Sequence, residues 1–499
     1  MAKNIYLETI GRSYVAALAD GEKLLEYHVE RAGESSIVGN IYKGQVATVL
    51  GGMQAAFVNI GLDRNAYLFV DEINADTDDV RGMVSGTLDI REGDEIAVQI
   101  VKDPSGNKGA KCSPHLSFAG RYLVYVPDYS EVSVSRKIED EEIKERLAEW
   151  VRSIAKKDEG GFIVRTAAEN VGKRELKKEA EALRDLYKKT LEKLEKATAP
   201  ALVHEEGDLV TRMLRDVYSQ DVTNIYVGER ELYDELRSRS KDAYGKADIV
   251  KKSVLFDKPT DMFGYFGLSA EVDKLLRNRV ELSNGAYIII DKTEALTAID
   301  VNTGKYTGEN NLEETVYKTN LIAAEEIARQ VRLRNIGGIV VVDFIDMELA
   351  EHREEVVKAL EKALRSDRSK CKVLGMSALG LVEFTRTKKR EETASKLVQP
   401  CPYCRGDGLI YSNVYVVLKI RAALLDVFAE GHKSAVIDLN AEIAEYVLSS
   451  AALRADANKI WKDKRIYLIP HRTYHTENFR IRGEDAKIPD LPEKARLLK

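Results

Sequence analysis

Two apolar segments of the sequence each end in side chains that can bind a divalent cation. Asp300 and Asn302 lie two residues apart at the end of the segment 295–302, so on a β-strand their side chains point to the same face. Asp343 directly follows the four apolar residues Ile339–Val342. Carboxylate and amide oxygens suit a hard cation, and Mg²⁺ needs only one or two carboxylates because it keeps most of its waters. Such an ion lowers the pKa of a bound water and stabilises charge that develops on a phosphate.

We therefore expect Asp300 and Asp343 to hold Mg²⁺, and Asn302 to orient a carboxylate or the attacking water. The alternative is structural: Asp343 caps a turn, and Asp300 pairs with a nearby lysine or arginine. Spacing alone favours neither interpretation, because aspartates are common at strand ends. Asp346 and Glu383 are weaker candidates, which we expect to be solvated or paired.

The elements around these residues have to bring them together. The apolar segments 286–290 and 295–301 flank the polar link 291–294, which predicts a β-hairpin. The run 339–342 has no polar alternation, which predicts a strand buried on both faces. An ionised carboxylate at the end of such a strand is costly unless it is paired or bound to metal. Between the two strands, the pattern over 312–334 predicts an amphipathic helix that can place them side by side.

A pair of cysteines forms the second candidate site. Cys401 and Cys404 have the spacing of a zinc knuckle and precede two glycines, but zinc requires four ligands and this pair supplies two. Cys371 or His352 could join them, although neither has a partner at metal-ligand spacing. We expect instead that a second chain contributes two more thiolates, which predicts an oligomer with zinc at its interface. A redox pair and two unbound thiols are the alternatives.

Aromatic and basic residues of the N-terminal third suggest a surface for nucleic acid. Phe57 and Tyr67 fall on neighbouring predicted strands, with Lys43 nearby in sequence and Lys108 and Lys111 in the loop beyond. Aromatic side chains on a barrel face, surrounded by lysines, can stack the bases of a single strand. Apolar residues flank Phe57, however, so the sequence alone favours a core position for its ring.

Two further basic segments could contact phosphates. Arg165 and Thr166 end a predicted strand, and a guanidinium beside a hydroxyl can grip a terminal phosphate. An ordinary surface arginine is the alternative, and these two residues alone favour it. The run "TRTKKR" at 385–390 is ordinarily a solvated face, but it could follow a phosphate backbone.

Length and composition set wider limits. The chain has 499 residues, of which 44% are hydrophobic and 32% charged, enough for several domains with proper cores. The net charge of -6 combines 76 basic and 82 acidic residues, which argues against a histone-like binder but not against local basic patches. The N-terminus lacks a signal-type apolar run, and no segment reaches the roughly 20 apolar residues of a membrane span. Four cysteines suggest a reducing cytosol.

The remaining pattern alternates strands and helices. Strand-like alternation over 1–35 precedes a β-rich region from Gly39 to Val101, whose frequent turns favour a small barrel. From 208 onwards strands and helices alternate in an α/β pattern, and a compact α/β appendix begins at 413. Further predicted elements are strands at 121–127, 162–166, 372–376 and 379–385, and helices at 138–156, 173–196, 269–280 and 350–366.

Four segments carry a resemblance to a known family. The string "AIDVNTGKYTGENNLEETVYKTNLIAAEEIARQVRLRNIGGIVVVDFIDM" and the later "CPYC" closely resemble the catalytic core of the ribonuclease E/G family. The segments "AAFVNIGLDRNAYLFV" and "GFIVRTA" look like its S1-type RNA-binding domain and its 5′-monophosphate sensor. The resemblance covers nearly the whole chain, in matching order.

The resemblance implies a multidomain α/β and β architecture. An S1-type OB barrel is inserted in an RNase H-like domain, and a 5′-sensor, a deoxyribonuclease I-like catalytic domain, a zinc link and a small C-terminal α/β domain follow. The implied boundaries are 1–35 with 208–275 for the RNase H-like domain, 36–115 for the S1-type domain, 116–207 for the sensor, 276–397 for the catalytic domain, 398–411 for the zinc link and 412–499 for the small domain.

The resemblance also implies an activity and its residues. The family cleaves single-stranded, A/U-rich RNA internally, prefers a 5′-monophosphate end, and acts in rRNA and tRNA processing and mRNA decay. Hydrolysis on Mg²⁺ gives 5′-phosphate and 3′-hydroxyl products. For Mg²⁺ the matching residues are Asp300 and Asp343, with Asn302 in support, and for an intersubunit Zn²⁺ in a homodimer or homotetramer they are Cys401 and Cys404. The sensor is matched by Arg165, Thr166 and the backbone near Val124. The RNA contacts are matched by Phe57, Tyr67 and Lys108.

The chain also departs from the family pattern. Tyr67 stands where a phenylalanine is usual, which should preserve stacking. The chain ends after the small domain, so the shorter ribonuclease G-like type fits better. We expect a cytoplasmic enzyme without a membrane span. The rival hypothesis is a non-catalytic, zinc-linked RNA-binding assembly protein in which the aspartates are structural.

Overall fold

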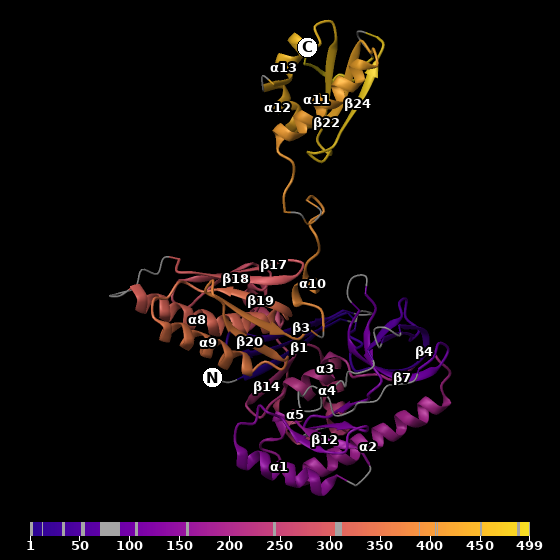
Figure 1. Ribbon diagram of the computed structural model, residues 1–499, viewed down its shortest axis with the longest axis vertical. Coiled ribbons are helices and arrows are strands. Elements are labelled where there is room, and N and C mark those ends of the chain that lie inside the picture. Colours follow the sequence, from indigo (N-terminus) through magenta and orange to yellow (C-terminus); the bar gives the residue numbers. More distant parts are fainter. Residues whose placement is uncertain are drawn as a thin grey trace. The chain divides into compact units, whose positions relative to one another are not determined.

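The computed structural model contains two compact units, Met1–Val398 and Gln399–Lys499 (Figure 1). We describe each unit by itself. The described residues are 3–11, 13–31, 35–50, 55–69, 90–104, 108–155, 159–242, 246–304, 312–388, 390–404, 406, 408–449, 452–486 and 490–498.

The N-terminal strands of the first unit join a segment that lies some 200 residues further along the chain. Their five-stranded sheet has the order β15-β14-β1-β2-β3, and β14 pairs with β1 in parallel. The strands are β1 (Lys3–Ile10), β2 (Ser13–Asp20), β3 (Lys23–Glu30), β14 (Val222–Val227) and β15 (Ser253–Leu255). The predicted strand-like alternation over 1–35 is confirmed, and the chain returns to this sheet after residue 208.

A closed barrel of five strands follows β3. Its order is β4-β5-β6-β8-β7, and pairing between β4 and β7 closes it, while β13 adds to the outside of β4. The predicted barrel is therefore confirmed. Its strands are β4 (Ile41–Leu50), β5 (Ala55–Asn59), β6 (Ala66–Phe69), β7 (Glu95–Lys102) and β8 (Lys111–Ser113), with β13 at Ala201–His204.

A four-stranded sheet with two helices occupies the next part of the first unit. Its order is β11-β12-β10-β9, from β9 (Phe118–Ala119), β10 (Leu123–Val126), β11 (Val132–Val134) and β12 (Gly161–Val164). The helices α1 (Glu141–Ile154) and α2 (Lys173–Lys196) pack on this sheet. Asp140 begins α1 by accepting hydrogen bonds from the backbone amides of Glu142 and Ile143. The predicted helix over 173–196 has the observed bounds of α2.

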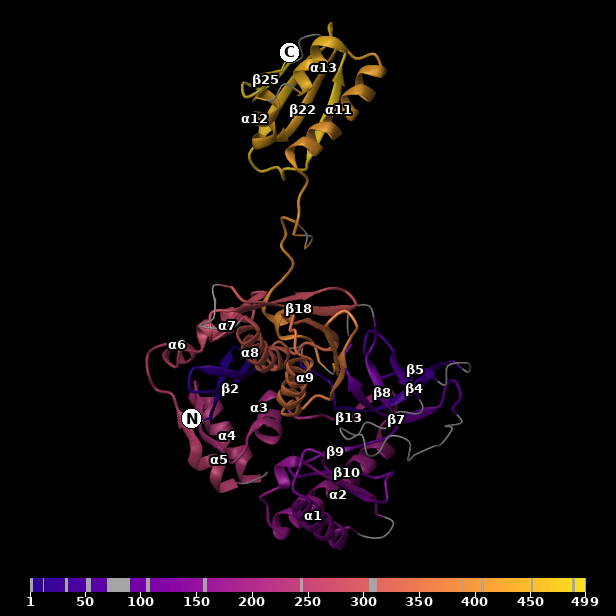
Figure 2. The ribbon, with the colours of Figure 1, turned by 60° about the vertical axis from the view of Figure 1, so that its left-hand side comes forward.

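A six-stranded sheet ends the first unit and carries the candidate aspartates. Its order is β16-β17-β18-β19-β21-β20. The strands are β16 (Arg279–Glu281), β17 (Tyr287–Lys292), β18 (Leu296–Asn302), β19 (Gly338–Asp343), β20 (Cys371–Met376) and β21 (Leu381–Arg386). The predicted hairpin is β17–β18. The helices α8 (Leu312–Leu333) and α9 (Ala350–Arg365) lie together beside this sheet in Figure 2.

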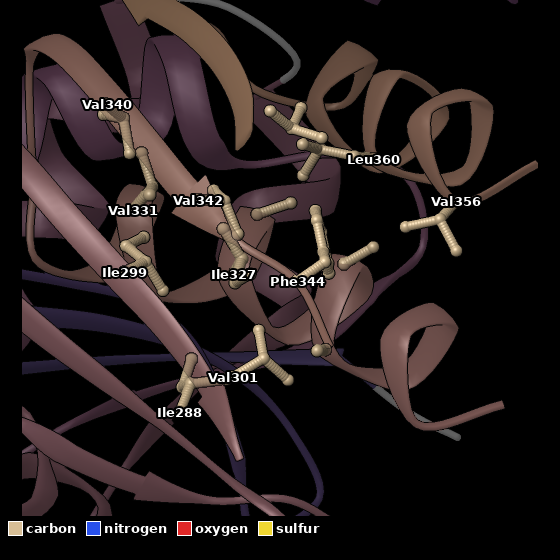
Figure 3. Packing of buried hydrophobic residues seen from close by; sticks show 14 of the residues in the cluster. Ile288, Ile299, Val301, Ile327, Val331, Val340, Val342, Phe344, Val356 and Leu360 are labelled. Atoms are coloured by element: carbon tan, nitrogen blue, oxygen red, sulfur yellow. The ribbon is translucent and has the colours of Figure 1, made fainter. Parts of the chain in front are cut away.

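Both helices pack against the same face of the sheet. Figure 3 shows Ile327 and Val331 of α8 close to Ile299 and Val342 of the strands, with α9 supplying Val356 and Leu360. Alternate residues of β18 and β19 are buried in this cluster. Apolar burial of this extent is the main source of stability for the sheet.

The prediction that β19 is buried on both faces is wrong. Val340 and Val342 are fully buried, but Ile339 is 50% exposed and Asp343 is also exposed. The helices cover only one face, so the other face of the sheet remains open. We call this surface the open face; it includes Ala298, Asp300, Ile339, Val341, Asp343 and Glu383.

The prediction of one helix over 269–280 is also wrong. The helix α7 ends at Lys274, and Arg279–Glu281 forms the edge strand β16, paired with β17. The sheet edge captures these residues because their backbone groups find partners there. The remaining helical segments of this unit are η3 (Thr166–Ala168), α3 (Leu209–Arg212), the π-helical turn η4 (Met213–Val217), α4 (Arg230–Asp242), α5 (Lys246–Lys252), α6 (Met262–Tyr265), α7 (Ser269–Lys274) and α10 (Thr393–Leu397).

The second unit is a small α/β domain, as the pattern from 413 predicted. Its four-stranded sheet has the order β24-β22-β23-β25, with β22 and β23 parallel. Its elements are α11 (Asn413–Ala429), β22 (Ser434–Asn440), α12 (Ala441–Ser449), α13 (Ala452–Lys459), β23 (Arg465–His471), β24 (Phe479–Glu484) and β25 (Arg496–Leu497). Across the described part of the chain, no helix combines the length and apolarity needed to cross a membrane.

Candidate active site

Asp300 and Asp343 lie on neighbouring strands at the same level of the sheet. The strands β18 and β19 run parallel, and their register places Asp300 opposite Asp343. Neighbouring strands are separated by about 4.8 Å. Both side chains are exposed on the open face. Two carboxylates from distant parts of the sequence therefore project side by side from the open face.

The amide of Asn302 is directed at the first of these carboxylates. Asn302 Nδ2 donates a hydrogen bond of 2.7 Å to Asp300 Oδ2. The two residues are separated by one position on β18 and therefore share the open face. This contact fixes one carboxylate oxygen and leaves the second oxygen of Asp300 to meet another ligand.

Helix α8 positions the loop that follows Asp343. The side chain of Asn320 is fully buried; its Nδ2 donates to the carbonyl of Ile345 at 2.8 Å, and its Oδ1 accepts from the Ile345 amide at 3.1 Å. At the start of the same helix, Glu313 accepts hydrogen bonds from the amides of Glu348 and Leu349 at 2.9 and 3.2 Å. Sequence reasoning missed both residues, although an asparagine on the apolar side of a predicted helix is itself a signal.

The structural alternative for the aspartates, like the metal-binding one, stays a prediction. Within the described residues, no ion pair joins Asp300 or Asp343 to a lysine or arginine. Asp346 is exposed in the loop after β19. Glu383 lies on the open face of β21 opposite Val341, and so sits diagonally from Asp343.

The donor set could hold a hydrated hard cation. No group of three or more histidine, cysteine, aspartate or glutamate side chains could hold a metal ion among the residues that the structure describes. A structural zinc site would require four such ligands, and a catalytic one three. Two carboxylates in register, with an amide beside them, are residues that could hold Mg²⁺ if waters completed its shell.

The barrel carries an aromatic pair on its outer surface. Phe57 lies opposite Tyr67 on β5 and β6, and their rings meet edge to face with centroids 5.9 Å apart. Phe57 is 37% exposed, so the core position that the sequence alone favoured is wrong. Tyr67 in turn lies opposite Lys111 on β8, and Lys108 is exposed just before that strand. Lys43 instead makes an ion pair with Glu95 at 2.9 Å.

Arg165 is not an ordinary surface arginine. Its Nη1 donates to the carbonyl of Gly120 at 2.5 Å and its Nη2 to Asp216 Oδ1 at 2.8 Å, while the side chain stays 24% exposed. Thr166 is exposed at the start of η3, and its hydroxyl lies 3.1 Å from that of Ser135.

Val124, the third residue of the predicted sensor, lies inside the sheet, opposite Ile163 on β12, with its side chain buried.

The basic run at 385–390, of which residue 389 lies outside the described residues, is interrupted by a buried arginine. Arg386 is buried and bonded to Asp367 at 2.9 Å, to Asn335 Oδ1 at 3.0 Å and to the carbonyl of Ile336 at 2.9 Å. Lys388 pairs with Glu392 at 2.9 Å. The suggested path for a phosphate backbone is wrong at Arg386, because this side chain ties the end of β21 to the core.

The cysteine pair lies at the start of the second unit. All four cysteines are among the described residues and are free thiols, with Cys401 exposed and Cys404 half-buried. Backbone amides of Cys404 and Tyr403 donate to the Cys401 sulfur and lower its pKa, which favours the thiolate. In the first unit, burial raises the pKa of Cys371 to about 11, and His352 Nδ1 binds Glu313 at 2.8 Å.

Comparison with known proteins gives consistent matches. Residues 117–389 match the model of the Ribonuclease E/G family, a range that includes Asp300, Asn302 and Asp343. The chain is 40% identical to ribonuclease G of Escherichia coli K12 over 418 residues, or 82% of this chain and 85% of that protein. It is 36% identical to ribonuclease G of Haemophilus influenzae over 476 residues, which cover 93% and 96% of the two chains. Ribonuclease E of Escherichia coli K12 is 33% identical over 505 residues, but these cover only 47% of that protein.

Proposed function

Because the chain belongs to the ribonuclease E/G family, we propose that it is an endoribonuclease that hydrolyses single-stranded RNA on the open face of the six-stranded sheet. The observation that carries this proposal is the register of Asp300 and Asp343 on parallel strands, with the amide of Asn302 bonded to Asp300. The relatives named ribonuclease G support an endoribonuclease that takes part in RNA processing.

We assign the metal-binding role to Asp300 and Asp343, which would hold Mg²⁺. When bound, this ion would activate water and stabilise the charge on the scissile phosphate. Asn302 keeps one oxygen of Asp300 fixed, and Asn320 and Glu313 hold the loop after Asp343. The strands of this sheet contain no histidine that could act as a general base toward the 2′-hydroxyl. We therefore propose hydrolysis that leaves 5′-phosphate and 3′-hydroxyl ends.

Substrate preference would come from two other parts of the first unit. Phe57 and Tyr67 would stack bases of a single strand, with Lys108 near its phosphates. Arg165 and Thr166, with the backbone near Val124, would bind a 5′-monophosphate. We propose that the enzyme prefers A/U-rich RNA with such an end, and that it acts in rRNA and tRNA processing and mRNA decay in the cytoplasm.

We also propose that Cys401 and Cys404 bind zinc between protomers. The exposure of Cys401 and its lowered pKa suit a metal thiolate. A second copy would supply the other two thiolates, which makes a homodimer or a homotetramer. The first unit's Cys371 and His352 each have other contacts, which makes them weaker candidates for the missing ligands.

Cleavage of a short RNA tests the proposed function against the rival assembly protein. A single-stranded A/U-rich oligonucleotide with a 5′-monophosphate is incubated with the full chain, with EDTA, and with Mg²⁺ added back. Cleavage that EDTA abolishes and Mg²⁺ restores, with 5′-phosphate on the downstream product, supports the metal-dependent hydrolase. RNA binding without cleavage under all three conditions supports the non-catalytic alternative.

A further inference from the structure

The guanidinium of Arg165 is held by two acceptors from different elements. The carbonyl of Gly120 comes from the turn between β9 and β10, and Asp216 Oδ1 comes from the π-helical turn η4. An arginine side chain has several rotatable bonds, and two simultaneous acceptors restrict it to one arrangement. These contacts use two of the five N–H donors of Arg165, so the group is fixed while it stays partly exposed.

Asp216 is itself firmly held. Its Oδ1 also accepts from Arg215 Nε at 3.0 Å, and its Oδ2 accepts from Arg215 Nη2 at 2.9 Å. Burial alone would raise the pKa of Asp216, but Arg165 and Arg215 outweigh it and hold the pKa far below its usual range. The carboxylate therefore stays ionised between two guanidinium groups.

A second carboxylate extends this cluster away from Arg165. Arg215 Nη1 binds Glu206, which follows β13, and the amide of Glu206 donates to Asn40 Oδ1 at 2.8 Å. The chain of contacts runs from Glu206 through Arg215 and Asp216 to Arg165. Glu206 binds Arg215, but among the described residues it makes no contact with Arg165. It is therefore a matched control for Asp216.

We propose that Asp216 is the positioning residue that sets the preference for a 5′-monophosphate. A phosphate that meets a guanidinium already fixed in place pays less ordering entropy than one that must order a mobile side chain. Without Asp216, Arg165 loses its charged partner and gains rotational freedom. This inference rests on the proposed role of Arg165 in recognising the 5′ end.

The test compares two oligonucleotides of one sequence, with either a 5′-monophosphate or a 5′-hydroxyl. For each variant of the full chain, kcat/KM is measured on both, and their ratio gives the 5′-end preference. We expect Asp216→Asn to lower this ratio at least about tenfold, the loss of roughly one charge-assisted hydrogen bond, with cleavage of the 5′-hydroxyl RNA within about twofold of wild type. Glu206→Gln should keep the ratio.

Two further variants separate positioning from charge and from folding. Arg165→Ala should reduce the ratio to about one, and adding Asp216→Asn to it should change nothing more, because the two residues act through one another. Arg165→Lys keeps the positive charge, and it provides a test of positioning even if Asp216→Asn does not fold. It should also lose the preference, because an ammonium cannot reproduce the fork of two fixed contacts.

The outcomes distinguish the failure of this inference from the failure of the sensor assignment. If Asp216→Asn keeps the ratio while Arg165→Ala abolishes it, Arg165 binds the 5′ end but Asp216 does not position it. The positioning role is also overturned if Asp216→Asn lowers kcat/KM equally on both oligonucleotides. It is likewise overturned if Arg165→Lys leaves the ratio intact. A ratio unchanged by Arg165→Ala refutes the sensor assignment itself.

Discussion

The side chain of Asn320 binds both backbone groups of Ile345, two residues after Asp343. It donates to the carbonyl at 2.8 Å and accepts from the amide at 3.1 Å, and it is fully buried. A buried side chain with two such bonds restricts the loop to one path. The position of Asp343 therefore depends on a residue that contacts neither the metal nor the RNA of the proposed mechanism.

We predict that Asn320→Ala destabilises the chain and slows cleavage. Two half-buried backbone groups of Ile345 lose their partner, which costs about 1–3 kcal/mol, measured by urea unfolding. Gln330→Ala is the control, because Gln330 is a buried amide on the same helix that bonds to Glu326 and Arg334 instead. It should lose stability without slowing cleavage of the folded protein. Equal cleavage rates in the two variants would contradict the positioning of Asp343 by Asn320.

The aromatic pair on the barrel leads to a prediction about RNA affinity. Phe57→Ala should weaken binding of a single-stranded oligonucleotide by about 1–3 kcal/mol, the usual contribution of one stacked base, while Phe57→Tyr should preserve it. Leu62→Ala removes another exposed apolar side chain of the barrel region and should leave the affinity unchanged. Fluorescence anisotropy measures all three. Equal losses for Phe57→Ala and Leu62→Ala would rule out a specific stacking surface.

Zinc content and assembly test the cysteine pair. We expect wild type to contain about one zinc ion per two protomers, because each protomer supplies two of four thiolates. Cys401→Ser should lose the zinc and shift sedimentation to a smaller species, whereas Cys371→Ser should change neither. An unchanged oligomer that contains no zinc would remove the intersubunit site.

An ion pair made by a buried carboxylate predicts how stability depends on pH. Glu26 of β3 binds Arg368 at 2.9 Å; burial would raise its pKa, but Arg368 and His28 hold it at about 2. A carboxyl group with a lowered folded-state pKa contributes stability that is fully present above its unfolded value, near 4.5, and is lost as the pH falls toward 2.

We therefore expect Glu26→Gln to be less stable than wild type at pH 7, by about 1–2 kcal/mol. The loss is limited to this size because Arg368 is partly exposed and solvent screens the ion pair. The difference should shrink as the pH falls below 4.5. Denaturant unfolding at several pH values measures it, and Glu145→Gln on the exposed side of α1 provides the control. A difference that is the same at every pH would mean that ionisation of Glu26 is not its cause.

Local sequence patterns predict much of the frame of this fold. The hairpin, the long helices and the barrel follow from apolar periodicity and turn residues, and four quoted segments identify the family, as the comparisons confirm. Two strands joined by one amphipathic helix favour parallel neighbours, which is how Asp300 and Asp343 meet. The division into six domains stays a prediction.

Features that depend on long-range packing could not be predicted. Four consecutive apolar residues in β19 look the same whether one face or both are covered, and only the placement of α8 and α9 decides this. Phe57 points outward because alternation on β5 places its two neighbours inside. Asp216 and Asn320 find partners 51 and 25 residues away, which no local pattern reveals.

The paired aspartates are the centre of the proposed function, and their substitution tests it most directly. Single-turnover cleavage of a 5′-monophosphorylated oligonucleotide in Mg²⁺ is measured for Asp300→Asn and Asp343→Asn. The control is Asp291→Asn, which alters an exposed carboxylate on the adjacent strand β17, bonded to Asn278. We expect cleavage to fall by at least about three orders of magnitude in both site variants, with RNA affinity retained, and to stay normal in the control. Normal cleavage by either Asp300→Asn or Asp343→Asn would contradict the account.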